Sequence, residues 1–238
     1  MQSPNFAPRM SAMPVSMMEN NRMPVSPRAE MLAEFEDVGS EVNHPRGSTL
    51  FREDEMPKQV FIVNSGRVKL AIASRDGRTI IVRVAGPGAV LGLSAALASR
   101  AHEVTAEVIE NTSVRAIPVR DFMALLQRRP SAAMAATRLV LEEHDAVFSD
   151  IRRFALPATV AGRLASLLLG WLAEPSRAGR KENRIIVPLT QEEIASMTGT
   201  SRETVSRVLQ QFRREKLIAT KGVCLTVLRP EALEQLAV

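Results

Sequence analysis

The sequence has one cysteine, one tryptophan and no tyrosine in 238 residues, and its other aromatic residues are eight phenylalanines. A single Cys excludes a disulfide framework, a four-thiolate iron–sulfur site and a Cys-rich zinc site, and it fits a reducing cytoplasm. The scarcity of aromatic side chains argues against an RNA surface built on base stacking. No run of about 18 apolar residues occurs, and no compact apolar run follows a basic start. The sequence therefore predicts neither a transmembrane helix nor a secretory signal.

The length predicts one large domain or two small ones, at roughly 100–200 residues per domain. The net charge of +5 is spread unevenly. Residues 1–30 carry three basic and two acidic side chains, residues 31–156 carry 16 of each, and residues 157–238 carry 12 basic and eight acidic ones. We therefore expect a polyanionic partner first in the last third of the chain. From the charge alone, a solvated surface is the alternative.

Residues 1–29 combine five prolines with Ser, Asn and Met, and they show neither a helical nor a strand period. They offer too little clustered apolar surface to offset the entropy of ordering, so we expect a disordered tail. We expect residues 30–129 to form a strand-rich domain, residues 130–156 a long helix with a hinge, and residues 157–238 a second domain.

Residues 45–118 are rich in strand signals. The apolar run 60–63 stops at Asn64-Ser65-Gly66, apolar residues alternate over 68–72, and Asp76-Gly77 is a hairpin signal before the β-branched run 79–84. Strands return at 102–109 and 114–117. Short strands at this spacing predict a β-sandwich or barrel, with a short helix inserted at 91–99.

A long helix is expected over 131–154, after a shorter helix that begins at Asp121 and ends near Pro130. Apolar residues of the long helix fall at spacings of 4, 7, 4 and 3, a heptad-like seam typical of a dimer interface. An ordinary core-facing helix is the alternative. The predicted seam consists of Ala136, Val140, His144, Val147, Ile151 and Phe154.

The most informative segment begins at Thr190. Thr190 and Glu193 form a capping box that opens a short helix, Gly199 ends it, and a second capping box within 200–203 opens another helix. The second helix has the i, i+3, i+4, i+7 pattern of a buried stripe, in Val205, Val208, Leu209 and Phe212. Two short helices joined by a Gly-containing turn predict a helix-turn-helix, whose second helix enters the major groove of DNA.

Two runs, 217–220 and 223–227, flank Lys221-Gly222 and predict a hairpin with a basic tip, the wing of a winged helix. The face of the second helix opposite the buried stripe carries side chains that can read base edges. Arginine can donate two hydrogen bonds to guanine, and glutamate can accept one from cytosine. The alternatives are a solvated helix face for Arg202 and Arg207, and completion of a capping box for Glu203.

The segment 189–209, above all Ser-Arg-Glu-Thr-Val-Ser-Arg at 201–207, closely resembles the DNA-binding motif of the CRP/FNR superfamily, the bacterial regulators related to cyclic-AMP receptor protein. Residues 60–68 and 86–92 resemble that family's β-roll, and the helix 131–154 resembles its dimerisation helix. The resemblance implies an α+β fold. It would comprise an N-terminal β-roll (a jelly roll of the cyclic-nucleotide-binding type), a long dimerisation helix and a C-terminal winged helix-turn-helix.

The resemblance also implies a function. The chain would be a cytoplasmic homodimeric transcription regulator and no enzyme. It would read double-stranded DNA at a two-fold symmetric site of the TGTGA…TCACA type, with RNA polymerase as a further partner and no membrane. The implied base contacts are Arg202, Glu203 and Arg207. The implied phosphate contacts are Thr190, Gln191, Ser201, Thr204 and, in the wing, Lys221.

The sensor half departs from the family pattern where cyclic AMP would be held. Leu93 stands where a carboxylate should bind the ribose, and Glu103-Val104 stands where an Arg and a hydroxyl residue should bind the cyclic phosphate. Leu93 accepts no hydrogen bond, and Glu103 repels phosphate. We expect an effector pocket without the usual cyclic-AMP contacts. Its candidate residues are Gly92, Leu93, Ser94, Glu103, Val104, Phe148 and Ser149, where Phe148 replaces a hydroxyl residue and Ser149 is retained.

No cofactor or metal site is predicted. One Cys cannot hold an iron–sulfur cluster, and the three histidines, His44, His102 and His144, are scattered along the chain. One alternative function is a cyclic-nucleotide-responsive regulator with a non-standard pocket, if a gap at 98–103 brings Arg100 into it. Another is a small-molecule-binding module that acts on a protein partner. Salt-dependent, sequence-preferring binding to duplex DNA separates this last alternative from the regulators.

Overall fold

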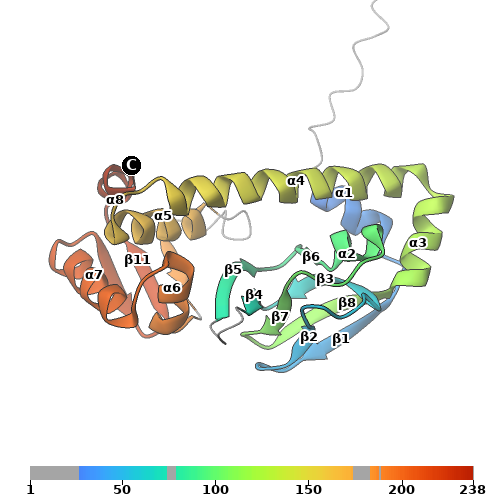
Figure 1. Ribbon diagram of the computed structural model, residues 1–238, viewed down its shortest axis with the longest axis horizontal. Coiled ribbons are helices and arrows are strands. Elements are labelled where there is room, and N and C mark those ends of the chain that lie inside the picture. The colour runs from blue at the N-terminus through green and yellow to red at the C-terminus, as the bar shows by residue number, and fades with distance from the viewer. Residues whose placement is uncertain (1–26, 74–78, 174–182, 188, 238) are drawn as a thin grey trace, which may run out of the picture.

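The computed structural model describes residues 27–73, 79–173, 183–187 and 189–237. The long helix α4 (Pro130–Ala155) runs along one side of the molecule (Figure 1). A β-rich domain packs beneath its first part, and a smaller domain of helices and short strands lies at its C-terminal end. The expected α+β order of a β-domain, a long helix and a helix-turn-helix domain is confirmed.

The β-domain consists of two four-stranded sheets, with strand orders β1-β8-β3-β6 and β2-β7-β4-β5. Alternate residues of each strand point to opposite faces, so the inward positions of both sheets can form one apolar core. Phe61, Val68 and Val114 belong to that core. The strands are β1 (Ser40–His44), β2 (Thr49–Phe51), β3 (Gln59–Ser65), β4 (Val68–Ala73), β5 (Thr79–Ala85), β6 (Val90–Leu91), β7 (Thr105–Val108) and β8 (Thr112–Pro118).

The strand signals of the sequence are confirmed at β3, β4, β5 and β8. Gly66 turns the chain between β3 and β4 with φ +84°, and a Cβ at this position would collide with Thr112. The predicted hairpin turn at Asp76-Gly77 lies outside the described residues, although β4 and β5 pair antiparallel as expected. The strand expected from His102 begins at Thr105, and the inserted helix α2 spans Leu93–Ala98.

Helix α1 (Pro27–Glu34) packs against α4. The prediction of a disordered tail over residues 1–29 is therefore wrong for residues 27–29. Glu30 makes an ion pair with Arg138 of α4 at 2.8 Å. Met31 and Phe35 are fully buried, and the Phe35 ring stacks on Phe122 of α3 (Val119–Arg128) at 4.9 Å. Helix α3 begins two residues before the predicted start at Asp121.

The C-terminal domain has one core shared by all its elements. These are α5 (Val160–Leu172), β9 (Arg184–Ile186), α6 (Gln191–Thr198), α7 (Arg202–Arg214), β10 (Ile218–Lys221), β11 (Cys224–Val227) and α8 (Pro230–Leu236). The three strands pair in the order β10-β11-β9. Their core includes Leu164, Leu168, Trp171, Ile194, Val205, Phe212 and Leu225. The predicted wing is therefore present, but the sequence reading missed β9 and α8.

Candidate nucleic-acid interface and effector pocket

The caps of α6 and α7 set the turn between the two helices. Thr190 and Glu193 close the predicted capping box, and Gly199 ends α6 with φ +62°. Ser201, rather than Thr200, caps α7, because its Oγ accepts a hydrogen bond from the Thr204 backbone N–H at 3.2 Å. The second predicted box is therefore wrong, since a single hydroxyl one residue later takes the cap position.

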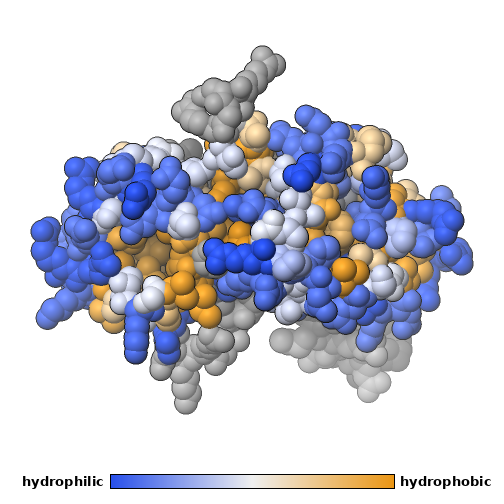
Figure 2. All heavy atoms as spheres, turned by 90° about the horizontal axis from the view of Figure 1, so that it is seen from below, coloured by the Kyte–Doolittle hydropathy of each residue, from blue (hydrophilic) through white to orange (hydrophobic). Residues whose placement is uncertain are grey.

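Helix α7 buries one face and presents the other. Val205, Val208, Leu209 and Phe212 are buried, as predicted. Arg202, Glu203 and Arg207 are all exposed on the other face. The end of the molecule where α7 lies is covered mainly by hydrophilic residues (Figure 2).

Glu203 does not close a box with Thr200, so its carboxylate stays exposed at the start of α7. A hydrogen bond from its own backbone N–H and one from Ser201 lower the pKa of Glu203 below its ordinary value of 4.5. The carboxylate is therefore charged at neutral pH and able to accept a hydrogen bond from a base edge.

The predicted phosphate contacts gather at the starts of the two helices and at the wing. Ser201 and Thr204 share a hydrogen bond between their hydroxyls at 3.2 Å. Thr190 is exposed, and both its backbone N–H and its hydroxyl donate to Glu193. Gln191 is half-buried, while Lys221 is exposed beside Gly222, the turn glycine of the wing (φ +60°).

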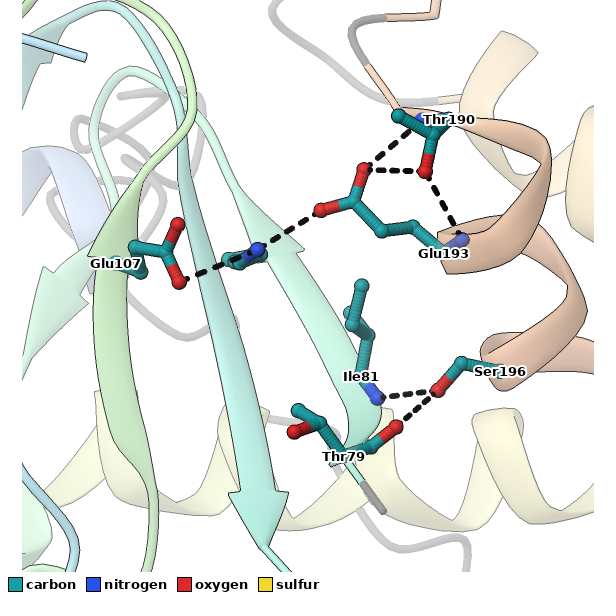
Figure 3. A network of polar contacts seen from close by, with 7 residues as sticks. Thr79, Ile81, Glu107, Thr190, Glu193 and Ser196 are labelled. Carbon is teal, nitrogen blue, oxygen red and sulfur yellow. Dashed lines mark hydrogen bonds and ion pairs between the residues drawn. The ribbon is translucent and has the colours of Figure 1, made fainter. Parts of the chain in front are cut away.

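Helix α6 is bound to the sensor domain by contacts that the sequence reading missed. Lys69 of β4 donates to Glu193 at 2.8 Å and lies 3.2 Å from Glu107 of β7. Figure 3 shows Glu107 and Glu193 facing one another from the two domains. Ser196 binds the edge of β5, where its hydroxyl accepts from the Ile81 N–H at 3.2 Å and donates to the Thr79 carbonyl at 2.6 Å.

The ionisation of this cluster follows from its contacts. Burial alone would lower the pKa of Lys69, but its hydrogen bonds to Glu193 and Glu107 raise that pKa on balance. Burial likewise opposes ionisation of Glu193, but the hydrogen bond from Lys69 and those from Thr190 bring the pKa of Glu193 below 4.5. Lys69 and Glu193 are thus both charged at neutral pH.

Replacing Lys69 with methionine should destabilise the protein by about 1–3 kcal/mol, because two partly buried carboxylates lose their shared cation. Urea unfolding monitored by circular dichroism measures this loss. The exposed pair Arg52–Glu55, whose charged atoms lie 3.9 Å apart, provides the control, and Arg52→Met should cost less than about 1 kcal/mol. An equal cost for the two variants would contradict a stabilising role for Lys69.

The stabilisation from Glu193 should depend on pH in a defined direction. Its folded pKa lies below 4.5, so the contribution is present above pH 4.5 and is lost as the pH falls through the folded pKa. Wild-type protein should therefore lose more stability on acidification from about pH 6 to pH 3 than Glu193→Gln loses. An equal loss of unfolding free energy in the two proteins across this range would refute a stabilising role for the ionised Glu193.

A pocket of about 440 Å³ lies between the β-domain and α4. Gly92, Leu93, Ser94, Glu103 and Val104 line it, as the sequence reading expected. Leu93 is apolar and 1% exposed, and the Glu103 carboxylate pairs with Arg100 at 2.9 Å. Arg100 also lines the pocket, as the alternative of a cyclic-nucleotide-responsive regulator with a non-standard pocket requires.

Two pocket candidates on α4 were misplaced. Phe148 is 50% exposed, and neither it nor Ser149 lines the pocket. Val140 and Val147, which are also predicted in the dimer seam, line the pocket, and Val147 is 56% exposed. A helix rotates by about 100° per residue, so a neighbouring position faces another direction.

Strands β4 and β5 separate this pocket from α6. Leu70 and Val82 line the pocket, whereas their neighbours Lys69 and Ile81 contact α6. Along β4 this is the alternation expected of a strand, whose successive side chains point to opposite faces. In β5 the register shifts opposite Leu70 and Ala71, and both Val82 and Arg83 line the pocket. The same two strands therefore form a wall of the pocket and the docking surface for the helix-turn-helix.

The free face of α4 differs from the predicted seam. Ala136 is 1% exposed and packs in the core of its own domain, so the prediction that it lies in a seam is wrong. His144 is exposed, with its ring 4.8 Å from that of Phe148, and the side chains of Ile151 and Phe154 lie outside the described ones. The apolar residues left exposed at heptad spacing are Met134, Leu141 and Phe148, at 53%, 59% and 50%.

Within the described part of the chain, no group of three or more His, Cys, Asp or Glu side chains is placed to hold a metal ion. None of the described helices is long and apolar enough to cross a bilayer.

The architecture defines a class of protein, in which a β-roll and a long helix are joined to a winged helix-turn-helix. Residues 41–129 match the cyclic nucleotide-binding domain family, and residues 162–236 match the Crp-like helix-turn-helix domain family.

The chain belongs to the CRP/FNR family of DNA-binding transcription regulators, and its relatives are regulators rather than enzymes. It is 31% identical over 209 residues to the CRP-like cAMP-activated global transcriptional regulator of Mycobacterium tuberculosis, a match that covers 82% of this chain and 87% of that one. It is 29% identical to the nitrogen fixation regulation protein FixK of Bradyrhizobium diazoefficiens, over 88% of this chain and 86% of the relative.

Two solved structures have the same fold. FixK2 from Bradyrhizobium japonicum superposes with a TM-score of 0.74 at 23% identity, over 84% of this chain and 98% of that one. A CRP-family transcriptional regulator from Thermus thermophilus superposes with a TM-score of 0.69 at 27% identity, over 82% and 96% of the two chains. The β-roll, the long helix and the winged helix-turn-helix are thus shared with CRP/FNR regulators.

Proposed function

We propose that the protein binds duplex DNA as a homodimer at a two-fold symmetric site of the TGTGA…TCACA type. The observation that carries this proposal is the exposed face of α7, where Arg202, Glu203 and Arg207 stand opposite a buried stripe. The two arginines suit guanine O6 and N7, and Glu203 suits the cytosine amino group. Ser201, Thr204, Gln191 and Thr190 at the helix starts, with Lys221 in the wing, are the proposed phosphate contacts.

The proposed dimer interface is the apolar stripe of α4. Met134, Leu141 and Phe148 are seven residues apart and largely exposed, so a second copy of the helix would bury all three. A two-fold dimer presents two recognition helices to successive major grooves, which matches a palindromic site. His144 lies beside this stripe on the same helix, in ring contact with Phe148.

The sensor pocket is the proposed effector site, and it would not use the usual cyclic-AMP contacts. Leu93 offers no carboxylate to a ribose. Glu103 is paired with Arg100, so at these positions no unpaired arginine is available for a cyclic phosphate. An effector would act through β4 and β5, since these strands touch both the pocket and α6. It would shift the balance between DNA-competent and DNA-incompetent arrangements of the two domains. RNA polymerase as a partner and a cytoplasmic location belong to the same proposal.

Titration of labelled duplexes by fluorescence anisotropy tests this function. A TGTGA…TCACA duplex should bind more tightly than a scrambled duplex of the same composition. Its affinity should fall roughly 10³-fold between about 50 and 200 mM salt, as expected when several phosphates are neutralised. Equal affinity for both duplexes would overturn the proposal and favour a role in protein contacts. Parallel titrations with cyclic AMP present test the alternative effector.

A further inference from the structure

Two polar side chains in the effector pocket make no side-chain hydrogen bond or ion pair with the described residues. Arg83 of β5 and His102, which precedes β7, both line the pocket. Buried hydrogen-bonding groups are nearly always paired, so an unpaired donor that lines a pocket indicates what a ligand would have to supply. From the sequence, His102 is only one of three scattered histidines, and Arg83 belongs to no motif.

His102 is the more buried of the two. It is 4% exposed, and its ring stacks on Phe51 with centroids 3.9 Å apart. Its backbone N–H donates to the Glu55 carbonyl, but within the described chain the ring nitrogens make no hydrogen bond. Burial lowers the pKa of His102, against the opposing influence of Glu55, so the imidazole is neutral and can donate one hydrogen bond.

Arg83 supplies the charge. It is half-buried on β5, and no carboxylate of the described residues pairs with it. The other ionisable groups that line the pocket are Arg100 and Glu103, which pair with each other, together with Glu143 and His144 on α4. Arg83 is therefore the guanidinium left for an anion, and a guanidinium binds a carboxylate through two parallel hydrogen bonds.

The rest of the pocket is apolar. Its volume of about 440 Å³ is that of a site for a small organic molecule. The apolar walls include Leu70, Val82, Val90, Leu91, Leu93, Val104, Val140 and Val147. A cyclic nucleotide would bring a ribose and a charged phosphate ring against such walls, whereas an apolar acid needs polar partners at one end only.

We infer that the pocket binds a small monocarboxylic acid with an apolar body. The carboxylate lies on the Arg83 guanidinium, the apolar body fills the space between the β-domain and α4, and the His102 ring is a second hydrogen-bond donor that the pocket offers to the ligand. The inference rests on the proposed function only in taking this pocket as the effector site. It adds the chemical class of the ligand and the two residues that recognise it.

Isothermal titration calorimetry on the full-length protein without DNA tests the inference, with octanoate and phenylacetate as probes. At least one acid should bind saturably with a dissociation constant below about 1 mM. The matching neutral amides, octanamide and phenylacetamide, should bind at least about tenfold more weakly. Binding of neither acid, or equal binding of acid and amide, overturns the inference. So does tighter binding of cyclic AMP than of both acids.

Variants separate recognition from folding. Arg83→Gln should weaken acid binding about tenfold while leaving amide binding unchanged, a selective effect that a general loss of structure would not produce. His102→Phe keeps an aromatic ring against Phe51 and should also weaken acid binding. Arg120→Gln, an exposed arginine on α3, is the matched control. Unchanged acid affinity in Arg83→Gln refutes the assignment, and because no DNA is present the result is independent of operator binding.

Discussion

Replacing Arg202 with alanine is expected to lower the preference for a TGTGA-type duplex over a scrambled one by about 5–150-fold, or 1–3 kcal/mol. Arg202 is exposed in the first turn of α7, the part of a recognition helix that reaches base edges. Its guanidinium can donate two hydrogen bonds to guanine, so this contact is lost when another base takes the place of guanine. Affinity for scrambled DNA, which rests on phosphate contacts, should change much less. Anisotropy titrations with both duplexes measure the ratio.

Arg214→Ala is the matched control, because Arg214 carries the same charge in the last turn of the same helix. It should weaken binding to both duplexes alike, if at all. A variant series in which Arg202→Ala keeps the full preference, or in which Arg214→Ala loses it to the same extent, would show that the start of α7 does not read the bases.

Replacing Leu141 with glutamate is expected to convert the dimer to monomers and to weaken binding to the palindromic duplex by about 100-fold or more. Leu141 is 59% exposed in the middle of the apolar stripe of α4. In a two-fold dimer both copies of the residue would be buried, so the substitution buries two unpaired charges. A monomer then binds one half-site only and loses the gain from joining two recognition helices. Sedimentation velocity and anisotropy measure the two effects.

Met56→Glu controls for the introduced charge, since Met56 is a similarly exposed apolar residue, at 58%, in the loop between β2 and β3. It should leave both the dimer and DNA binding intact. If Leu141→Glu remains a dimer with wild-type affinity, the interface lies on another surface.

The helix-turn-helix could be predicted from the sequence because its signals are local. A capping hydroxyl, a turn glycine and an i, i+3, i+4, i+7 stripe all lie within a few residues of each other, as at Gly199 and Val205. The second cap was misplaced by one residue because Thr200 and Ser201 are both good capping residues. The local pattern does not say which of the two hydroxyls is used.

The docking of α6 on the sensor could not be predicted in this way. Lys69 and Glu193 are 124 positions apart, and nothing near either residue signals the other. The seam predicted on α4 is wrong at Ala136 for a different reason, although Val147 of the same seam is 56% exposed. This helix is apolar on two faces, one packed in its own domain through Ala136 and one left free at Leu141. Periodicity alone does not tell these faces apart.

The sequence predicts some of the residues that line the pocket but not all of them. Leu93 and Glu103 were found because they depart from a family pattern, and both line it. Arg83 belongs to no such pattern, and only the fold places it in the same pocket as His102. A pocket shared by a β-roll and a helix depends on contacts between distant segments, so its unpaired groups are visible only in three dimensions.

The central claim, that two copies of α7 read one symmetric site, is tested most directly by changing the distance between half-sites. Inserting five base pairs, about half a helical turn, between TGTGA and TCACA moves one half-site to the other side of the duplex. The account predicts that anisotropy will show a loss of affinity of about 100-fold for the lengthened duplex, close to the level of a single half-site. Equal affinity for the two spacings would contradict a rigid dimer that reads both half-sites at once.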